Sequence, residues 1–204
     1  MTHDGCAARV AANPAKQKRR IAPIRTRFDM RSEDGTTGSR KTRPTIELRA
    51  MSAADFEAFE RVTIPRYAAD TLRTDGGTPA AALDYARESL AKLLPEREAT
   101  RDHFLYTVHS VEHDAAVGTI WIGIVTNKQR RTAYVFDVQI AAAHRRRGFA
   151  TSAFRAVEAR VRELGLTEIG LHLFGYNEAA FRLYRQLGYH ASHISMVKSL
   201  TAEI

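Results

Sequence analysis

The sequence predicts an α/β fold around a mixed, mostly antiparallel central sheet. Three observations predict it: segments that alternate apolar and polar residues, segments with apolar residues at steps of three and four, and helix-like segments between the later strands. The chain has 204 residues, of which 44% are hydrophobic and 26% are charged. These proportions are ordinary for a globular protein, so one domain with a tail, or two small domains, can bury a sizeable core.

The first 44 residues differ from the rest in composition. They contain 11 Lys or Arg against four Asp or Glu, a net charge of +7, which leaves +1 of the total of +8 to residues 45–204. They have no sustained period of 2 or 3.6, and Gly35–Arg43 is rich in Gly, Ser and Thr. Such a segment buries too little apolar surface to offset the entropy of ordering. We therefore predict a basic, disordered tail at 1–44 and a folded domain at 45–204.

The folded segment is expected to open with a strand and a helix. Thr45–Arg49 alternates like a strand. Ser52 followed by Asp55 resembles a capping box, which satisfies the first amides of a helix. That helix is predicted to run towards Tyr67, with Pro65 kinking or ending it because proline lacks an N–H.

A second helix and three strands are expected next. Thr78 and Pro79 are typical of an N-cap and a first helical position, and the helix must stop before Pro95. The strands are expected at His103–Ser110, Ala116–Val125 and Tyr134–Ile140, with a polar turn at Glu112–Asp114.

The last third of the chain is expected to alternate helices and strands. Gly148–Leu164 carries one apolar stripe, and Gly165 follows it as a C-terminal stop. A strand is expected at Glu168–Phe174, and a helix with an asparagine N-cap at Asn177–Leu187. A final strand is expected near Ser192–Ser199.

The loop Arg145-Arg146-Arg147-Gly148-Phe149-Ala150 lies between an apolar strand and a helix. The first amides of a helix have no partner inside it, and the positive end of the helix dipole favours a phosphate. Gly148 lets the backbone approach a ligand closely, and the arginines add charge. Taken alone, the pattern fits a solvated basic turn as well as a phosphate site.

Two separate parts of the sequence resemble the GNAT superfamily of N-acetyltransferases. The motif Arg145-x-x-Gly148-x-Ala150 resembles the acetyl-CoA loop, and Asn177-x-x-Ala180-x-x-Leu183-Tyr184-x-x-x-Gly188-Tyr189 resembles the helix after the splayed strand. The resemblance covers about residues 45–200 and looks like a bacterial single-domain subgroup of undefined substrate. It implies a GNAT-like sheet with helices on both faces and a splayed strand pair. One departure is Ala141-Ala142-Ala143-His144, where relatives often have a proline.

The resemblance implies acetyl-CoA as co-substrate and no metal. The pantetheine arm would lie along the strand before the loop, and the phosphates at the loop and at the start of the next helix. The implied cofactor-binding residues are Val138, Gln139, Ile140, Arg145, Arg146, Arg147, Gly148, Phe149, Ala150, Thr151 and Asn177.

Transfer of an acetyl group from a thioester to an amine needs an acid for the leaving thiolate and a base for the amine. By resemblance, Tyr184 occupies the position of the general acid, and a phenol pKa of about 10 suits a thiol of about 8.5. His172 matches a base position of some peptide N-terminal acetyltransferases, while Asp137 on the neighbouring strand could act directly or through water. Each also has a plain interpretation: a core tyrosine, or a satisfied polar residue in the sheet.

The predicted activity is direct transfer of an acetyl group to a primary amine of a small molecule or peptide, in a ternary complex. Two alternatives stay open: a nucleic-acid-binding protein that uses the basic tail, and a CoA-binding regulator without catalysis. No motif in 45–204 supports base recognition, so nucleic acid is not favoured. The single cysteine, Cys6, and the lack of an apolar run of about 18 residues predict a cytoplasmic protein without a membrane partner. A homodimer stays open.

Overall fold

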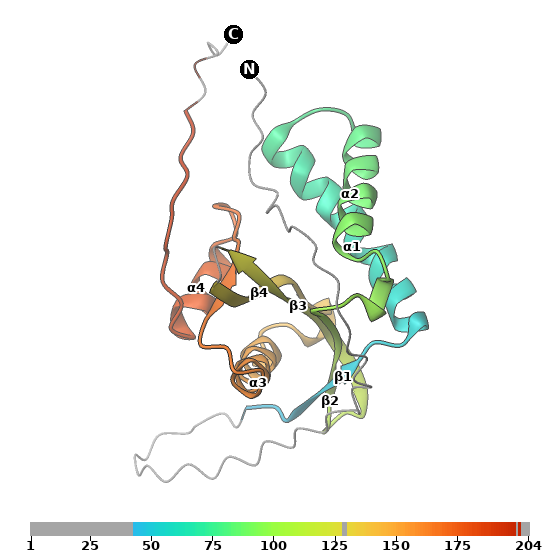
Figure 1. Cartoon of the computed structure of the whole chain (residues 1–204), viewed down its shortest axis with the longest axis vertical. Helices are drawn as coiled ribbons and strands as arrows, with labels where there is room; N and C mark the ends of the chain where they lie inside the picture. Colours follow the sequence, from blue (N-terminus) through green and yellow to red (C-terminus); the bar gives the residue numbers. More distant parts are fainter. Residues whose placement is uncertain (1–42, 128–129, 199, 201–204) are drawn as a thin grey trace. The chain divides into compact units, whose positions relative to one another are not determined.

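The computed structural model describes residues 43–127, 130–198 and 200. Its main elements follow the order β1, α1, α2, β2, β3, β4, α3, β5, α4 (Figure 1). The chain divides into two compact units, of which the first ends at Leu171 and the second begins at His172. Residues 1–42 of the expected tail lie outside the described residues, so the tail stays a prediction.

Five strands form one sheet in the order β1, β2, β3, β4, β5. Their bounds are β1 Ile46–Ala50, β2 His103–Ser110, β3 Ala115–Asn127, β4 Arg130–Ile140 and β5 Ile169–Leu171. The first four strands pair antiparallel, and β5 pairs parallel to β4. Short turns can join antiparallel neighbours, whereas a parallel strand requires a crossover, here through a helix. The predicted mixed, mostly antiparallel sheet is confirmed.

Three helices cover the two faces of the sheet (Figure 1). Phe59 of α1 shares a buried cluster with Leu105 of β2. Phe104, the residue before Leu105 on β2, lies under Arg160 of α3, whose guanidinium carbon is 5.7 Å from the ring centroid. Because successive side chains of a strand point to opposite faces, these contacts place α1 and α3 on different faces. The helices are α1 Ala53–Asp75, α2 Pro79–Leu93 and α3 Phe149–Glu163.

Side-chain caps determine where three of the helices begin. Ser52 and Asp55 form a reciprocal capping box, in which each backbone N–H donates to the other's side chain. The Thr78 hydroxyl caps α2, and the Asn177 side chain caps α4, which spans Glu178–Gln186. The three predicted helix starts are confirmed because each depends on a residue beside it in the sequence.

The helix was predicted to run towards Tyr67, with Pro65 kinking or ending it, and the predicted end is wrong because α1 continues past Pro65 to Asp75. An internal proline costs a helix about 3 kcal/mol or more. The packing of α1 continues past it, where Ala68 shares a buried cluster with Ala82 and Ala86 of α2. We infer that the packing of α1 against α2 offsets the free-energy cost of Pro65 inside the helix.

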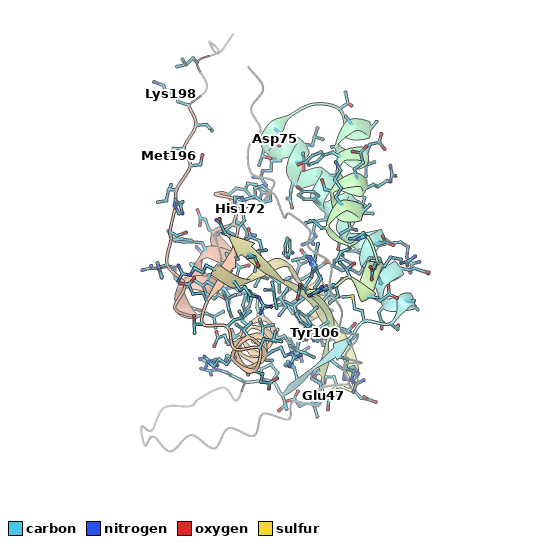
Figure 2. All side chains as sticks on the ribbon, viewed as in Figure 1. Glu47, Asp75, Tyr106, His172, Met196 and Lys198 are labelled. Carbon is cyan, nitrogen blue, oxygen red and sulfur yellow. The ribbon has the colours of Figure 1, made fainter. Side chains whose placement is uncertain are left out.

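Of the two strands expected in the last third, the one at Glu168–Phe174 is present as β5 but shorter than predicted, and the one near Ser192–Ser199 is not found among the described residues. β5 stops at Leu171, so His172 lies after the strand and not on it. Residues 192–198 form no strand, and Met196 in that segment is 89% exposed (Figure 2). Alternating residues make a strand only where a neighbouring strand pairs with their backbone.

Candidate active site

Strand β4 contains a bulge at Phe136. On β3, Trp121 pairs with Asp137. The next residue, Ile122, pairs with Val135, which leaves Phe136 without a residue opposite it. Phe136 stacks on Trp121 with ring centroids 4.6 Å apart, and Asp137 forms an ion pair with α1. The bulge thus brings two consecutive side chains to one face and bends the strand.

Beyond the bulge, β4 has a partner on one side only among the described strands. Pairing with β5 ends where Val135 meets Leu171, whereas pairing with β3 continues to Ile140. The stretch Val138–Ile140 therefore has an outer edge that no described strand covers. Such an edge can accept an extended chain with amide groups as an added strand. This is the splayed arrangement that the resemblance implied.

The loop after β4 turns the chain sharply into α3. Arg146 has a φ of 60° and Gly148 a φ of 90°, both in the left-handed region. That region costs a residue with a side chain about 1–2 kcal/mol, a cost that glycine avoids. Arg145 donates from Nε to the Ile140 carbonyl oxygen at 2.9 Å and so fastens the loop to the end of β4.

The loop and the first turn of α3 form an exposed, positively charged surface. Residues 145–147 are three exposed arginines. The helix begins at Phe149, and its first amides have no partner inside the helix. The Phe149 side chain is only 2% exposed, so this residue can offer a ligand only its backbone N–H. Ala150 and Thr151 follow in the same turn and are half-buried.

Asp137 is held between the bulge and α1 by Arg66. Its side chain is 12% exposed and forms the ion pair with that guanidinium. Burial raises the pKa of the Asp137 carboxyl above 3.8, and the charge and hydrogen bond of Arg66 oppose this shift. Among the described residues, Oδ2 of Asp137 has no hydrogen-bond partner. This oxygen is itself buried, so only a group that enters the site could meet it.

A hollow of about 260 Å³ lies between α1 and the sheet. Gln139 in its floor is two residues beyond Asp137 on β4 and so points to the same face. Val62 in its wall is one helical turn before Arg66. The residues that define wall and floor are Ala58, Phe59 and Val62 of α1 and Thr107, Thr119 and Gln139 of the sheet.

Three predicted site residues belong to the second unit. His172 is exposed and directly follows β5, and its ring lies edge-on to Phe174 at 5.5 Å between centroids. Asn177 caps α4. Tyr184 is 9% exposed on that helix, with its ring centroid 5.7 Å from that of Tyr189. Burial of Tyr184 fits both a packing role and a hydroxyl held in a fixed position.

Sequence reasoning missed two features of the first unit. Arg66 meets Asp137 across 71 positions of the chain, and no local pattern marks it as a partner. The bulge at Phe136 depends on the register with β3, which the residues of β4 alone do not reveal. A positive side chain on the apolar side of a helix was the one available signal for Arg66.

Comparison with known proteins assigns the chain to a family. The sequence profile of the Acetyltransferase (GNAT) family matches residues 71–189, more than half of the chain. The chain belongs to the GNAT family. This GNAT protein is 28% identical over 156 residues to the uncharacterized N-acetyltransferase YycN of Bacillus subtilis (strain 168), covering 76% of this chain and 99% of the relative. It is 25% identical over 153 residues to the uncharacterized N-acetyltransferase YdgE of the same organism, covering 75% of this chain and 97% of that relative.

A solved structure agrees with these relatives. The crystal structure of the YycN acetyltransferase matches this GNAT protein with a TM-score of 0.72 at 27% identity, covering 78% of this chain and 100% of that chain. The protein is therefore an acetyltransferase with the mixed α/β fold of its family. Within the part of the chain that the structure describes, no helix is long and apolar enough to cross a membrane. In the same residues, no group of three metal-binding side chains comes together.

Proposed function

We propose that this GNAT acetyltransferase moves the acetyl group of acetyl-CoA directly to a primary amine of a small molecule or peptide, within a ternary complex. The observation that best supports this proposal is the open edge of β4, which leads directly into the positively charged loop at the start of α3. The edge suits an arm that contains amides, and the loop suits phosphates. CoA has both features, and acetyl-CoA is the usual donor of this family.

The proposed contacts divide CoA between two stretches of the chain. Backbone groups of Val138–Ile140 hold the pantetheine arm along the edge of β4. The amides that begin α3 and the arginines of residues 145–147 hold the pyrophosphate. Arg145 already donates from Nε to Ile140, so a phosphate would meet its two terminal nitrogens. Asn177 contributes by capping α4, the helix that carries Tyr184.

The proposed reaction has one addition and one elimination step. The amine nitrogen attacks the thioester carbonyl carbon, and the carbonyl electron pair moves to oxygen. The tetrahedral intermediate then collapses, the bond from carbon to sulfur breaks, and the Tyr184 hydroxyl protonates the leaving sulfur. The nitrogen loses its second proton to solvent as the amide forms, and a proton from solvent restores the Tyr184 hydroxyl. A phenol of pKa about 10 can protonate a thiolate whose acid has a pKa of about 8.5 as the charge develops.

The amine must also lose a proton. A lysine-like amine with a pKa of about 10.4 is neutral in only about one molecule in 2,500 at pH 7. Asp137 is supported as the base by the hollow on the same face of the sheet and by its Oδ2, which has no partner among the described residues. His172, exposed after β5, is the alternative base. In either case the base transfers the proton to solvent after the step.

A screen of acceptors tests the proposed function. The full chain is mixed with acetyl-CoA and, in turn, polyamines, amino acids, aminoglycosides and peptides, and release of the free CoA thiol is followed. We expect one class to release CoA in equal amount to an N-acetylated product identified by mass spectrometry. If acetyl-CoA binds but no amine is acetylated, the protein is a CoA-binding regulator and the proposal fails.

A further inference from the structure

The turn between β2 and β3 lies against the loop that precedes α3. Nη2 of Arg147 in the loop is 3.3 Å from Nε2 of His113 in the turn. The centroid of the His113 ring also lies 6.4 Å from that of Phe149, the first residue of α3, and 6.4 Å from that of His144. A side chain from outside the GNAT loop motif therefore borders the proposed phosphate site.

Hydrogen bonds within the turn hold the backbone of His113 in place. Its N–H donates to the hydroxyl oxygen of Ser110 at 3.3 Å, and Ser110 is fully buried. The same hydroxyl donates to the Glu112 carboxylate at 3.2 Å, and this carboxylate also accepts from the backbone N–H of Thr45 at 2.6 Å. The His113 side chain is exposed, so an imidazole that starts from a fixed backbone position is open to a ligand.

The groups that face the His113 imidazole are basic. They are Arg147 of the loop and His144 of the short helix before it. The two acids of the turn have other partners: Glu112 accepts from Thr45 and Ser110, and the Asp114 carboxylate lies 3.6 Å from a different histidine. An anion that reached His113 and Arg147 would therefore meet donors whose charge these acids do not already neutralise.

The contact between Arg147 and His113 determines what each side chain does before a ligand binds. A guanidinium only donates hydrogen bonds, so His113 Nε2 accepts and the imidazole is neutral in this contact. A phosphate would accept from Arg147 in its place, and Nε2 would then be free to take a proton from solvent and to donate as well. Histidine suits this change because imidazoles ordinarily gain or lose their charge near neutral pH.

We propose that His113 and Arg147 together bind a phosphate of CoA, and that His113 takes up a proton from solvent when this phosphate binds. The inference rests on the proposed acetyl-CoA site and adds to it a binding residue from the β2–β3 turn. The pyrophosphate and the 3′-phosphate monoester of CoA share the required chemistry. Because a bound phosphate favours the charged imidazole, the affinity that His113 contributes is largest at low pH and is lost as pH rises.

Calorimetric titration of the full chain with CoA, at about pH 6.5 and about pH 8.5 in buffers without phosphate, tests the inference. The test variant is His113→Gln, whose amide oxygen can still accept from Arg147 but whose side chain cannot gain a proton. We expect it to bind CoA about fivefold or more weakly than wild type at the lower pH and within about twofold at the higher pH. At the lower pH it should also take up fewer protons per bound CoA, as measured in two buffers of different ionisation enthalpy.

A control variant and a second ligand complete the test. His193→Gln makes the same change at an exposed histidine of the second unit, and we expect it to bind CoA as wild type does at both pH values. Dephospho-CoA lacks the 3′-phosphate and so identifies the bound group. If only CoA binding is weakened in His113→Gln, the contact is with the 3′-phosphate; if dephospho-CoA loses the same affinity, it is with the pyrophosphate.

Three results would overturn the inference. The first is an unchanged CoA affinity of His113→Gln at the lower pH. The second is an equal loss at both pH values, because a change in the shape of the turn would cause it without any role for the charge. The third is an equal loss in His193→Gln. If folded wild type binds CoA at neither pH, the proposed acetyl-CoA site fails as well, whereas CoA binding that does not depend on His113 rejects this inference alone.

Discussion

At the scale of the residue, the site depends on a few side chains whose surroundings restrict them. Asp137 is buried, which raises its pKa, yet Arg66 stabilises its charged form. The ion pair also ties α1 to the bulge of β4, so one carboxylate has both a packing role and a proposed chemical role. Tyr184 combines the same two roles on α4. Substitutions that keep shape and remove one polar group can separate these roles.

Tyr184→Phe should lower kcat with the best acceptor by about 10²–10⁴-fold and leave acetyl-CoA affinity within a few-fold. Phenylalanine keeps the ring that packs against Tyr189 and removes the proposed proton donor. Tyr189→Phe, which makes the same chemical change in the neighbouring ring, is the control and should retain turnover. Steady-state kinetics that show full activity for Tyr184→Phe would remove the general-acid role. A higher KM for acetyl-CoA at unchanged kcat would assign Tyr184 to binding instead.

The pH profile of kcat/KM should distinguish the two candidate bases. A base acts when deprotonated, so activity rises with pH through its pKa. Burial raises the Asp137 pKa from 3.8, whereas an ordinary imidazole titrates near 6.5. We expect Asp137→Asn to lower kcat/KM by about 10²–10⁴-fold. We expect His172→Gln to keep the wild-type kcat/KM and the rise of kcat/KM with pH on the acidic side of the profile. Loss of the acidic limb in His172→Gln would identify His172 as the base.

At the scale of the element, local signals proved sufficient for helix starts and for the main strands. The caps at Ser52, Thr78 and Asn177 were readable because each cap bonds within three residues of itself. The strands β2, β3 and β4 could be predicted from the alternation of apolar and polar residues. The bulge at Phe136 and the short β5 were not, because register and strand length depend on a partner strand distant in sequence.

The same limit applies to the candidate site. The loop arginines and Gly148 form a contiguous motif, so the sequence alone pointed to them. Arg66 and the hollow beside α1 arise only when the helix packs on the sheet. The hydrogen bond from Ser152 Oγ to the Pro44 carbonyl oxygen likewise joins residues more than 100 positions apart. Contacts of this kind are set by tertiary packing, which local periodicity does not encode.

Gly148→Ala should weaken CoA binding by at least about tenfold, or about 1.4 kcal/mol. The added Cβ lies beside the phosphate loop at a φ of 90° and 3.1 Å from Pro44. Gly165→Ala is the matched control, because Gly165 has a φ of 73° but a Cβ there meets nothing within 4 Å. Both variants should lose about 1–2 kcal/mol of unfolding free energy, measured by denaturant titration. Unchanged CoA affinity in folded Gly148→Ala would place the ligand elsewhere.

At the scale of the whole molecule, most of the net positive charge lies outside the segment that carries the family's motifs. Residues 45–204 are close to neutral, and the first 44 carry most of the positive charge. Pro44, which directly precedes residues 45–204, accepts a hydrogen bond from Ser152 in the first turn of α3. Membership of the GNAT family accounts for the sheet, the open edge of β4 and acetyl transfer.

Calorimetric titration of the full chain with acetyl-CoA tests whether the edge of β4 and the loop before α3 form a CoA site. We expect one site with a Kd of roughly micromolar, about −8 kcal/mol, because the edge of β4 and the loop together meet both halves of the ligand. Circular dichroism on the same sample establishes that the protein is folded. A folded protein that gives no binding heat with acetyl-CoA up to about millimolar concentration, corresponding to about −4 kcal/mol, would contradict the account.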